Sequence, residues 1–278
     1  MSLPPTLSGS PVPGLPATGD PAICPSAEPG FPAGPSSSPL ISVVVPVRNE
    51  APNVAPLVAE IAAALAGVPH EIVYVDDGST DTTAQAVREA PAPVRLLRHA
   101  ASCGQSAAIV SGIRAARAPW IATLDGDGQN DPADIPRLWA RAQAEGSNTL
   151  VAGWRTSRKD TATKRFTSRI ANRVRARLLG DATPDTGCGL KVFPRELFLA
   201  LPHFDHMHRF LPALVLRGGG RVVSESVGHR PRTRGVSKYG TLDRLAVGIV
   251  DLLGMMWLQR RWTRPRLLPD DSTASDRA

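Results

Sequence analysis

The sequence predicts an α/β protein built on a mainly parallel β-sheet that helices cover on both faces. The first observation behind this prediction is that short apolar runs alternate with amphipathic runs between residues 40 and 153. The second is that the connections between the runs are short, as in parallel sheets covered on both faces. The third is that acidic clusters follow three of the apolar runs, because such sheets bind ligands at the carboxyl ends of their strands.

The alternation assigns the elements of the first half in chain order. Short apolar runs rich in β-branched residues are expected to be strands, and the longer amphipathic runs are expected to be helices. The expected strands cover residues 41–45, which Pro46 ends, and then 71–75, 94–98, 120–124 and 149–153. The expected helices cover residues 54–66, with Asn53 as N-cap, and then 80–89, 105–116 and 133–145.

The second half is less regular. A helix is expected over about residues 163–179, and another over 209–216 between strands at 190–193 and 222–227. Residues 242–262 are apolar but interrupted by charges, and the apolar part, broken by Asp251, is too short to span a bilayer. Its tryptophans and flanking arginines are typical of a helix lying at a membrane interface, and a core helix or a dimer interface is the alternative.

Composition divides the chain into four parts. Residues 1–39 are rich in Pro, Gly, Ser and Ala and nearly uncharged, so we expect a disordered leader. The α/β domain follows at 40–240, then an amphipathic helix with a basic end at 241–266 and a disordered tail at 267–278. Because no secretory signal is recognised and the three cysteines lack disulfide or metal spacing, the domain is expected in the cytoplasm.

The formal net charge of +7 indicates a polyanionic partner: nucleic acid, anionic lipid or a phosphorylated substrate. Nine Lys or Arg residues stand against one acid between residues 155 and 177. A nucleic-acid-binding protein is disfavoured because the sequence lacks the aromatic interleaving and motifs of that class, and because such a function would leave the acidic clusters unexplained.

Three acidic clusters are expected at one edge of the sheet: Asn49-Glu50, Asp76-Asp77 and Asp125-Gly126-Asp127. Two carboxylates one residue apart, with glycine allowing close approach, suit a shared Mg²⁺ or Mn²⁺ ion. A motif of this kind standing alone is more often a solvated acidic turn. Its position beside other carboxylates favours the metal site.

These motifs, VVVPVRNE at 43–50, DDGSTD at 76–81 and DGDGQ at 125–129, resemble the family-2 glycosyltransferases of GT-A fold. The closer resemblance is to the polyprenyl-phosphate subgroup, which includes dolichol-phosphate mannosyltransferases and bactoprenol-phosphate sugar transferases. It covers about residues 40–262. It implies transfer of a sugar from a UDP- or GDP-sugar to undecaprenyl or dolichyl phosphate, by a peripheral enzyme at the cytoplasmic face of the inner membrane. Homo-oligomer formation is left open.

The resemblance also implies roles for particular residues. The positions implied to bind the nucleotide are Pro46, Val47, Glu50, Asp77 and Asp125. The implied ligands of Mg²⁺ or Mn²⁺ are Asp125, Asp127 and Gln129. The positions implied to hold the acceptor phosphate are Arg155, Lys164, Arg165, Ser168, Arg232 and Lys238. The residues implied to be catalytic are Asp127, Arg155 and Arg232.

The basic second half fits a phosphate acceptor. A phosphate monoester is already anionic near neutral pH, so it needs positioning and charge compensation rather than deprotonation. The alternative is an enzyme of the same fold acting on a sugar hydroxyl, which needs a general base, and Asp185 is the candidate. His203, His206 and His208 are expected in surface or substrate contacts, because their spacing does not suit one helical face.

Overall fold

The computed structural model describes residues 38–156, 175–231 and 241–261, without the side chains of 241–247. The disordered leader and tail therefore stay predictions, since only residues 38 and 39 of the two segments are described. The helix expected at 163–179 is described only at its end, where residues 175–179 are helical.

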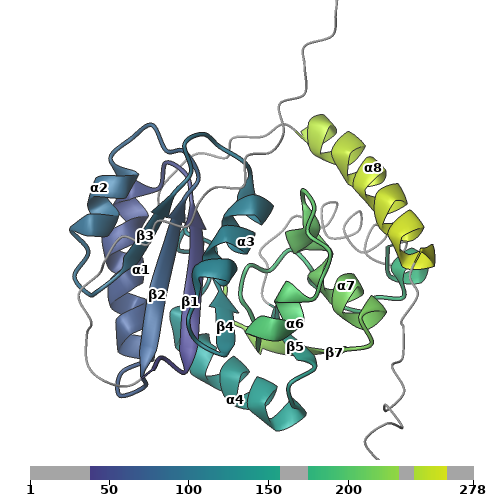
Figure 1. The fold of residues 1–278 in the computed structure, drawn as a ribbon, viewed down its shortest axis with the longest axis horizontal. Coiled ribbons are helices and arrows are strands. Elements are labelled where there is room, and N and C mark those ends of the chain that lie inside the picture. The colour runs from purple at the N-terminus through teal and green to yellow at the C-terminus, as the bar shows by residue number, and fades with distance from the viewer. Residues whose placement is uncertain (1–37, 157–174, 232–240, 262–278) are drawn as a thin grey trace, which may run out of the picture. The chain divides into compact units, whose positions relative to one another are not determined.

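The core is one seven-stranded sheet with the strand order β3-β2-β1-β4-β6-β5-β7 (Figure 1). The strands are β1 (Ile41–Val47), β2 (His70–Asp76), β3 (Arg95–Arg98), β4 (Trp120–Thr123), β5 (Thr149–Arg155), β6 (Lys191–Pro194) and β7 (Arg221–Val227). Neighbouring strands pair in parallel except at β6, which is antiparallel to both β4 and β5. The prediction of a mainly parallel sheet is confirmed.

The helices lie in the connections between the strands, except for α8, which follows β7. They are α1 (Ala51–Ala64), α2 (Thr83–Arg88), α3 (Gln105–Ala115), α4 (Ile135–Glu145), α6 (Arg195–Leu199), α7 (Leu211–Arg217) and α8 (Thr241–Arg260). Two 3₁₀ turns, η1 (Pro132–Asp134) and η2 (Met207–Arg209), precede α4 and α7. The short helix α6 was not predicted from the sequence, which indicated only a strand at 190–193 and then a helix at 209–216.

Both faces of the sheet are buried at its centre. Along β1, Val43 and Val45 pack into a hydrophobic cluster that contains residues of α1 and α4, while Val44 packs into a second cluster with α3, α6 and α7. All three valines are fully buried. A strand covered on both faces reads as a continuous apolar run, which is why β1 was recognisable without alternation.

The prediction that Pro46 ends the first strand is wrong, because β1 continues to Val47 and pairs with Asp76 of β2. Along β1, the backbone N–H and C=O groups of every second residue point toward β4. The Val44 carbonyl is one of these, since it accepts a hydrogen bond from Leu124 N, and the nitrogen of Pro46, two residues on, points the same way. The pairing of β1 with β4 ends at Val44. The missing N–H of Pro46 is therefore not needed by any ladder.

The N-cap assignment of the first helix is also wrong, because α1 begins at Ala51 and its N-cap is Glu50. Asn53 lies inside the first turn, where its side-chain amide donates to Glu50 Oε2 at 2.6 Å. Pro52 at the start of the helix has a fixed φ suited to that position. The helix thus starts immediately after the Asn-Glu motif and orients its glutamate.

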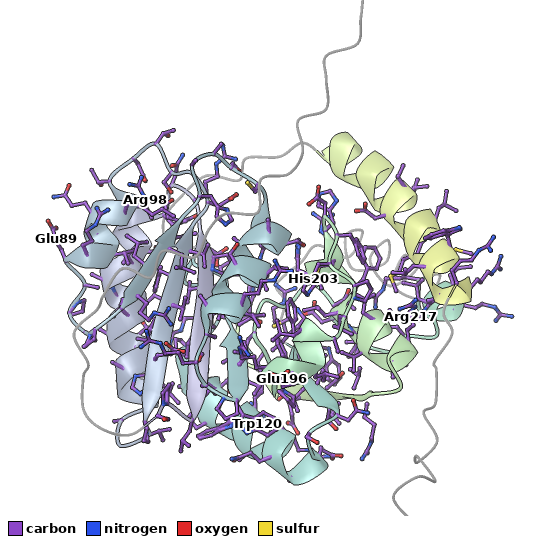
Figure 2. The ribbon with its side chains drawn as sticks, in the orientation of Figure 1. Glu89, Arg98, Trp120, Glu196, His203 and Arg217 are labelled. Atoms are coloured by element: carbon purple, nitrogen blue, oxygen red, sulfur yellow. The ribbon has the colours of Figure 1, made fainter. Side chains whose placement is uncertain are left out.

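Helix α8 packs on the second cluster through the buried Met255. Arg217 of α7 donates from Nε to the Leu258 carbonyl, and Figure 2 shows this side chain beside α8. The opposite side carries an exposed apolar stripe of Ile249, Val250, Leu253 and Trp257. Within the described ranges, no helix combines the length and apolar character that crossing a bilayer requires.

Candidate active site

The acidic clusters meet at the carboxyl edge of the sheet, as predicted, because β1 lies between β2 and β4 and all three run in parallel. Asp77 N donates to the Val47 carbonyl at 2.9 Å, which joins the ends of β1 and β2. Gly126, after β4, lies against Val47: a Cβ at this glycine would approach the Val47 side chain to 2.4 Å. Only glycine allows the Asp-Gly-Asp turn to lie this close to β1.

Asp125 is held from three sides. Its carboxylate accepts a hydrogen bond from Gln105 Nε2 at 2.8 Å, and its backbone N–H donates to the Asn130 side chain at 3.4 Å. Its carboxylate also lies directly on the backbone of Gly189, where a Cβ would approach Oδ2 to 2.2 Å. Asp125 is therefore fixed by helix α3, by its own turn and by the segment before β6.

Asp127 lies in the same turn, where its Oδ1 accepts the backbone N–H of Gln129 at 3.1 Å. Burial raises the pKa of Asp125 above the ordinary value, and the neighbouring negative charge of Asp127 raises it further. Two carboxylates this close repel each other, and a divalent cation relieves that repulsion. The oxygen ligands of the turn therefore fit Mg²⁺ or Mn²⁺.

A group of positive charges faces these carboxylates. Lys191 begins β6 and is buried beside β4, where it pairs with Thr123. Its ammonium donates to the Cys188 carbonyl. Burial lowers the pKa of Lys191, and the charge of Asp125 opposes that shift. The charges of Lys191 and Arg155 in turn counter the rise in the pKa of Asp125.

Arg155, at the end of β5, forms a bidentate ion pair with Asp185. The Nε–Oδ2 distance is 2.6 Å and the Nη2–Oδ1 distance is 2.8 Å. Burial alone would lower the pKa of Arg155, but the hydrogen bond and charge of Asp185 raise it overall. Asp185 therefore fixes the guanidinium plane, which a sequence reading of Asp185 as a general base did not anticipate.

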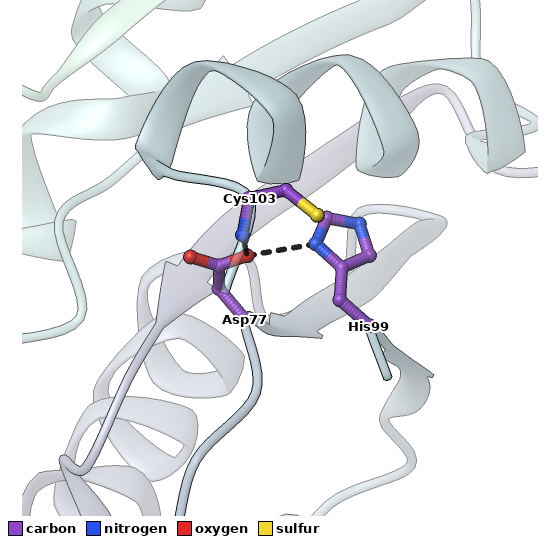
Figure 3. A group of neighbouring side chains, drawn as sticks. All are labelled: Asp77, His99 and Cys103. Atoms are coloured by element: carbon purple, nitrogen blue, oxygen red, sulfur yellow. Dashed lines mark hydrogen bonds and ion pairs between the residues drawn. The ribbon is translucent and has the colours of Figure 1, made fainter. Parts of the chain in front are cut away.

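The other end of the edge is built around Asp77 (Figure 3). Its Oδ1 lies 2.8 Å from His99 Nδ1 and accepts from Cys103 N at 2.8 Å. Its Oδ2 accepts from Ser102 Oγ at 2.7 Å and from Gly104 N at 2.9 Å. Burial alone would raise the pKa of Asp77, and these hydrogen bonds lower it overall. Asp77 thus ties the end of β2 to the loop before α3.

Side chains that follow β2 hold the Asn49-Glu50 motif at the end of β1. Asn49, which has a φ of +54°, donates from its backbone N–H to Ser79 Oγ at 2.9 Å. The backbone N–H of Glu50 donates to Thr83 Oγ1 at 2.9 Å. Pro46, Val47, Glu50 and Asp77 lie along this one edge of the sheet, and their role in nucleotide binding stays a prediction.

The sequence analysis missed Gln105, which contacts Asp125, and its neighbour Ser106. Gln105 and Ser106 open α3, and polar residues in the first turn of a helix after a strand were the available signal. Ser106 Oγ lies 2.8 Å from His208 Nδ1. Burial lowers the pKa of His208 to about 3, and the nearby charge of Lys191 acts in the same direction. Neutral His208 therefore lies on the cationic side of the site.

The other two histidines have separate partners. His203 stacks on Phe198 with ring centroids 5.4 Å apart. His206 Nδ1 lies 3.0 Å from Asp251 Oδ2 of α8. The three histidines thus point to three different places.

Five residues expected to bind the acceptor phosphate lie outside the described residues. They are Lys164, Arg165, Ser168, Arg232 and Lys238. Of that set, the structure describes Arg155 alone. The Gln129 backbone carbonyl accepts from Arg230 N at 2.9 Å, which brings the segment leading to Arg232 to the Asp-Gly-Asp turn.

A sheet of this kind with an Asp-x-Asp turn after a central strand defines a glycosyltransferase of GT-A fold. The chain matches the family described as "Glycosyl transferase family 2" over residues 42–201 and belongs to that family. A solved structure with the same fold is glucosyl-3-phosphoglycerate synthase from Mycobacterium tuberculosis in complex with Mg²⁺ and uridine diphosphate. Its TM-score is 0.59 at 18% identity, over 83% of this chain and 84% of that chain.

Two curated relatives narrow the subgroup. Dodecaprenyl-phosphate galacturonate synthase from Rhizobium johnstonii is 39% identical over 81% of this chain and 69% of its own length. Undecaprenyl-phosphate 4-deoxy-4-formamido-L-arabinose transferase from Pseudomonas aeruginosa is 36% identical over 78% of this chain and 65% of its own length. The chain thus spans about two thirds of these relatives and belongs with the polyprenyl-phosphate sugar transferases.

Proposed function

We propose that this protein transfers a sugar, with inversion, from a nucleotide diphosphate sugar to the phosphate of a polyprenyl lipid. The observation that carries the proposal is that one short segment contacts both sides of the site: Asp185 pairs with Arg155, and Gly189 lies against the Asp125 carboxylate. A cationic group thereby adjoins the acidic edge within one site. The names of the curated relatives support the same acceptor class.

On the donor side, Pro46, Val47, Glu50 and Asp77 hold the nucleoside at the ends of β1 and β2. Asp125, Asp127 and Gln129 hold the cation, Mg²⁺ or Mn²⁺, beside the diphosphate. When bound, such an ion neutralises the negative charge that develops on the leaving nucleotide. Gln105 and Gly189 keep the Asp125 carboxylate in place for this role.

On the acceptor side, Arg155 presents a guanidinium whose plane Asp185 has already fixed. Guanidinium groups bind phosphate with directed hydrogen bonds, so a fixed plane orients the attacking oxygen. Lys164, Arg165, Ser168, Arg232 and Lys238 complete the phosphate site. Because the acceptor is already ionised, the transfer needs no base on this side.

The alternative acceptor, a sugar hydroxyl, would need a general base. Asp185 is the residue the sequence offers for that role. Its carboxylate is buried and takes part in a bidentate ion pair with Arg155. A carboxylate in such a pair is a weak base, so this arrangement favours the phosphate acceptor.

An enzyme with a lipid acceptor must bring its active site to the membrane surface. The exposed stripe of Ile249, Val250, Leu253 and Trp257 places apolar side chains on one side of α8, and the exposed Arg260 and Arg261 follow it. This combination suits the head-group region of an anionic bilayer. We propose that α8 rests on the cytoplasmic face of the membrane and brings the site to its lipid substrate.

The membrane proposal is tested by co-sedimentation with anionic phospholipid vesicles. We expect Val250→Asp combined with Leu253→Asp to reduce the bound fraction at least roughly tenfold, since each change places a charge where an apolar side chain entered the interface. The control is Leu40→Asp, which changes an exposed leucine at the amino end of β1. Equal binding by both variants would exclude α8 as the contact.

The transfer itself is tested with purified protein, radiolabelled UDP- and GDP-sugars, and vesicles that contain undecaprenyl phosphate. The control vesicles contain undecaprenol, which has the same chain but no phosphate. We expect a β-linked lipid product that forms only with the phosphate lipid and only with Mg²⁺ or Mn²⁺. An α-linked product, or transfer to undecaprenol, would contradict the proposal.

A further inference from the structure

A second group of metal-binding side chains lies on the nucleoside side of the site. Asp77 follows β2, His99 follows β3, and Cys103 precedes α3. One ligand atom from each, a carboxylate oxygen, an imidazole nitrogen and a sulfur, lies within 4.8 Å of the other two. Figure 3 shows the three side chains converging.

The ligand types differ from those of the Asp125–Asp127 turn. Sulfur and nitrogen favour Zn²⁺, whereas Mg²⁺ and Mn²⁺ favour oxygen. Ligand atoms around a tetrahedral zinc lie roughly 3.3–3.7 Å apart, given bond lengths of about 2.0–2.3 Å. Separations of up to 4.8 Å therefore need to close by only about 1 Å, which side-chain rotation can supply.

The surroundings support metal binding by each of the three side chains. His99 Nε2 lies 3.0 Å from Ser111 Oγ, and a hydroxyl can either donate or accept. It can therefore hold the tautomer that keeps a proton on Nε2 and leaves Nδ1 free for a metal. The second Asp77 oxygen, Oδ2, stays anchored by Ser102 Oγ and Gly104 N.

The cysteine supplies access. Cys103 is exposed, so an ion can reach its sulfur from solvent, and water can fill a fourth coordination position. Its backbone N–H already holds Asp77 Oδ1, which keeps the sulfur and the carboxylate on one short segment. Binding replaces the contact between His99 and Asp77 with two metal bonds and releases the thiol proton to solvent.

We propose that Asp77, His99 and Cys103 form a Zn²⁺ site separate from the Asp125–Asp127 site. Strand β1 lies between β2 and β4, so two strand spacings, about 10 Å, separate the strands that carry the two sites. Because Asp77 is a nucleoside-binding residue in the proposed function, bound Zn²⁺ competes with the donor nucleotide. The competition between Zn²⁺ and the nucleotide rests on the proposed function, whereas the existence of the zinc site does not.

Cobalt substitution tests the site without any activity measurement. Purified protein is titrated with Co²⁺ and then with Zn²⁺, and the sulfur-to-cobalt charge-transfer absorption is followed. We expect the band in the wild type and in Cys24→Ser, and we expect Zn²⁺ to abolish it. Cys103→Ser, which keeps the backbone N–H that holds Asp77, and His99→Gln should lose the band and weaken Zn²⁺ binding at least about tenfold.

The outcomes test the existence of the zinc site and its competition with the nucleotide separately. A band that persists in Cys103→Ser, or one that requires Asp127 and is lost in Asp127→Ala, overturns the zinc site. In calorimetry, UDP and GDP should bind the Zn²⁺-loaded wild type at least about tenfold more weakly than the Zn²⁺-treated Cys103→Ser variant. Unchanged nucleotide affinity in a protein that shows the cobalt band would contradict the competition and leave the zinc site standing.

Discussion

Gly189→Ala tests the placement of Asp125 most directly. A Cβ at Gly189 would lie 2.2 Å from Asp125 Oδ2, 2.3 Å from Cγ and 2.6 Å from Oδ1. Since real Cβ contacts are essentially never shorter than 3.0 Å, the carboxylate must move by about 0.8 Å or more. Displacements of about 1 Å in a catalytic group can reduce turnover roughly 10²-fold.

The same change has a limited effect on stability. Asp125 is displaced at the end of a short side chain, and its hydrogen bond from Gln105 is lost, which costs about 1 kcal/mol. Strain from overpacking adds roughly 1–3 kcal/mol. We therefore expect a variant that folds, with a modestly lower Tm and with kcat reduced about 10²-fold in the transfer assay.

Two further variants make this expectation decisive. Gly228→Ala is the matched control, because its Cβ would meet its nearest atom at an ordinary 3.5 Å. In the Asp125→Ala background no carboxylate is left to collide, so Gly189→Ala should cost less stability there than in the wild type. Full activity of Gly189→Ala, or equal stability losses in both backgrounds, would refute the contact.

Three other outcomes are expected. Wild-type His208 stays neutral in the folded protein but binds a proton in the unfolded chain, so the free energy of unfolding should fall as the pH drops from 6.5 to about 3. His208→Asn should lose this part of the pH dependence: in urea unfolding, the free energy of unfolding of the wild type should fall more steeply with pH than that of the variant, by up to about 1.4 kcal/mol per pH unit. Parallel pH dependences of the two proteins would disprove this. Asp127→Ala should abolish turnover while the circular dichroism spectrum stays native, and full activity of this variant would refute the metal assignment. Arg232→Ala should impair transfer while UDP or GDP still binds in calorimetry, and loss of nucleotide binding would move this arginine to the donor side.

The sequence predicted the parallel part of the fold because its signals are local. Buried strands such as Ile41–Val47 read as continuous apolar runs, and the acidic residues that follow them mark the carboxyl edge. The contact between Asp77 and the loop at residues 99–104 was not predictable in the same way. It joins segments more than twenty residues apart through side-chain geometry, and no periodicity encodes such a contact.

Strand β6 shows most clearly what local signals leave out. Its apolar run at Leu190–Phe193 was recognised as a strand, but its direction depends on tertiary pairing with β4 and β5. An antiparallel strand enters the sheet at the edge where its parallel neighbours leave it. The amino end of β6, with Gly189 before it and Lys191 at its start, therefore meets the carboxyl end of β4 beside Asp125.

The reversed strand also explains how donor and acceptor groups share one site. Asp125 follows β4, Arg155 ends β5, and the segment that carries Asp185 and Gly189 leads into β6 between them. The carboxylate that fixes Arg155 and the glycine that fixes Asp125 thus belong to one short stretch of chain. A displacement of this stretch would move the groups on both sides together. Substitutions at Asp185 and Gly189 should consequently impair transfer more than either donor binding or acceptor binding alone, which separate binding and single-turnover measurements can resolve.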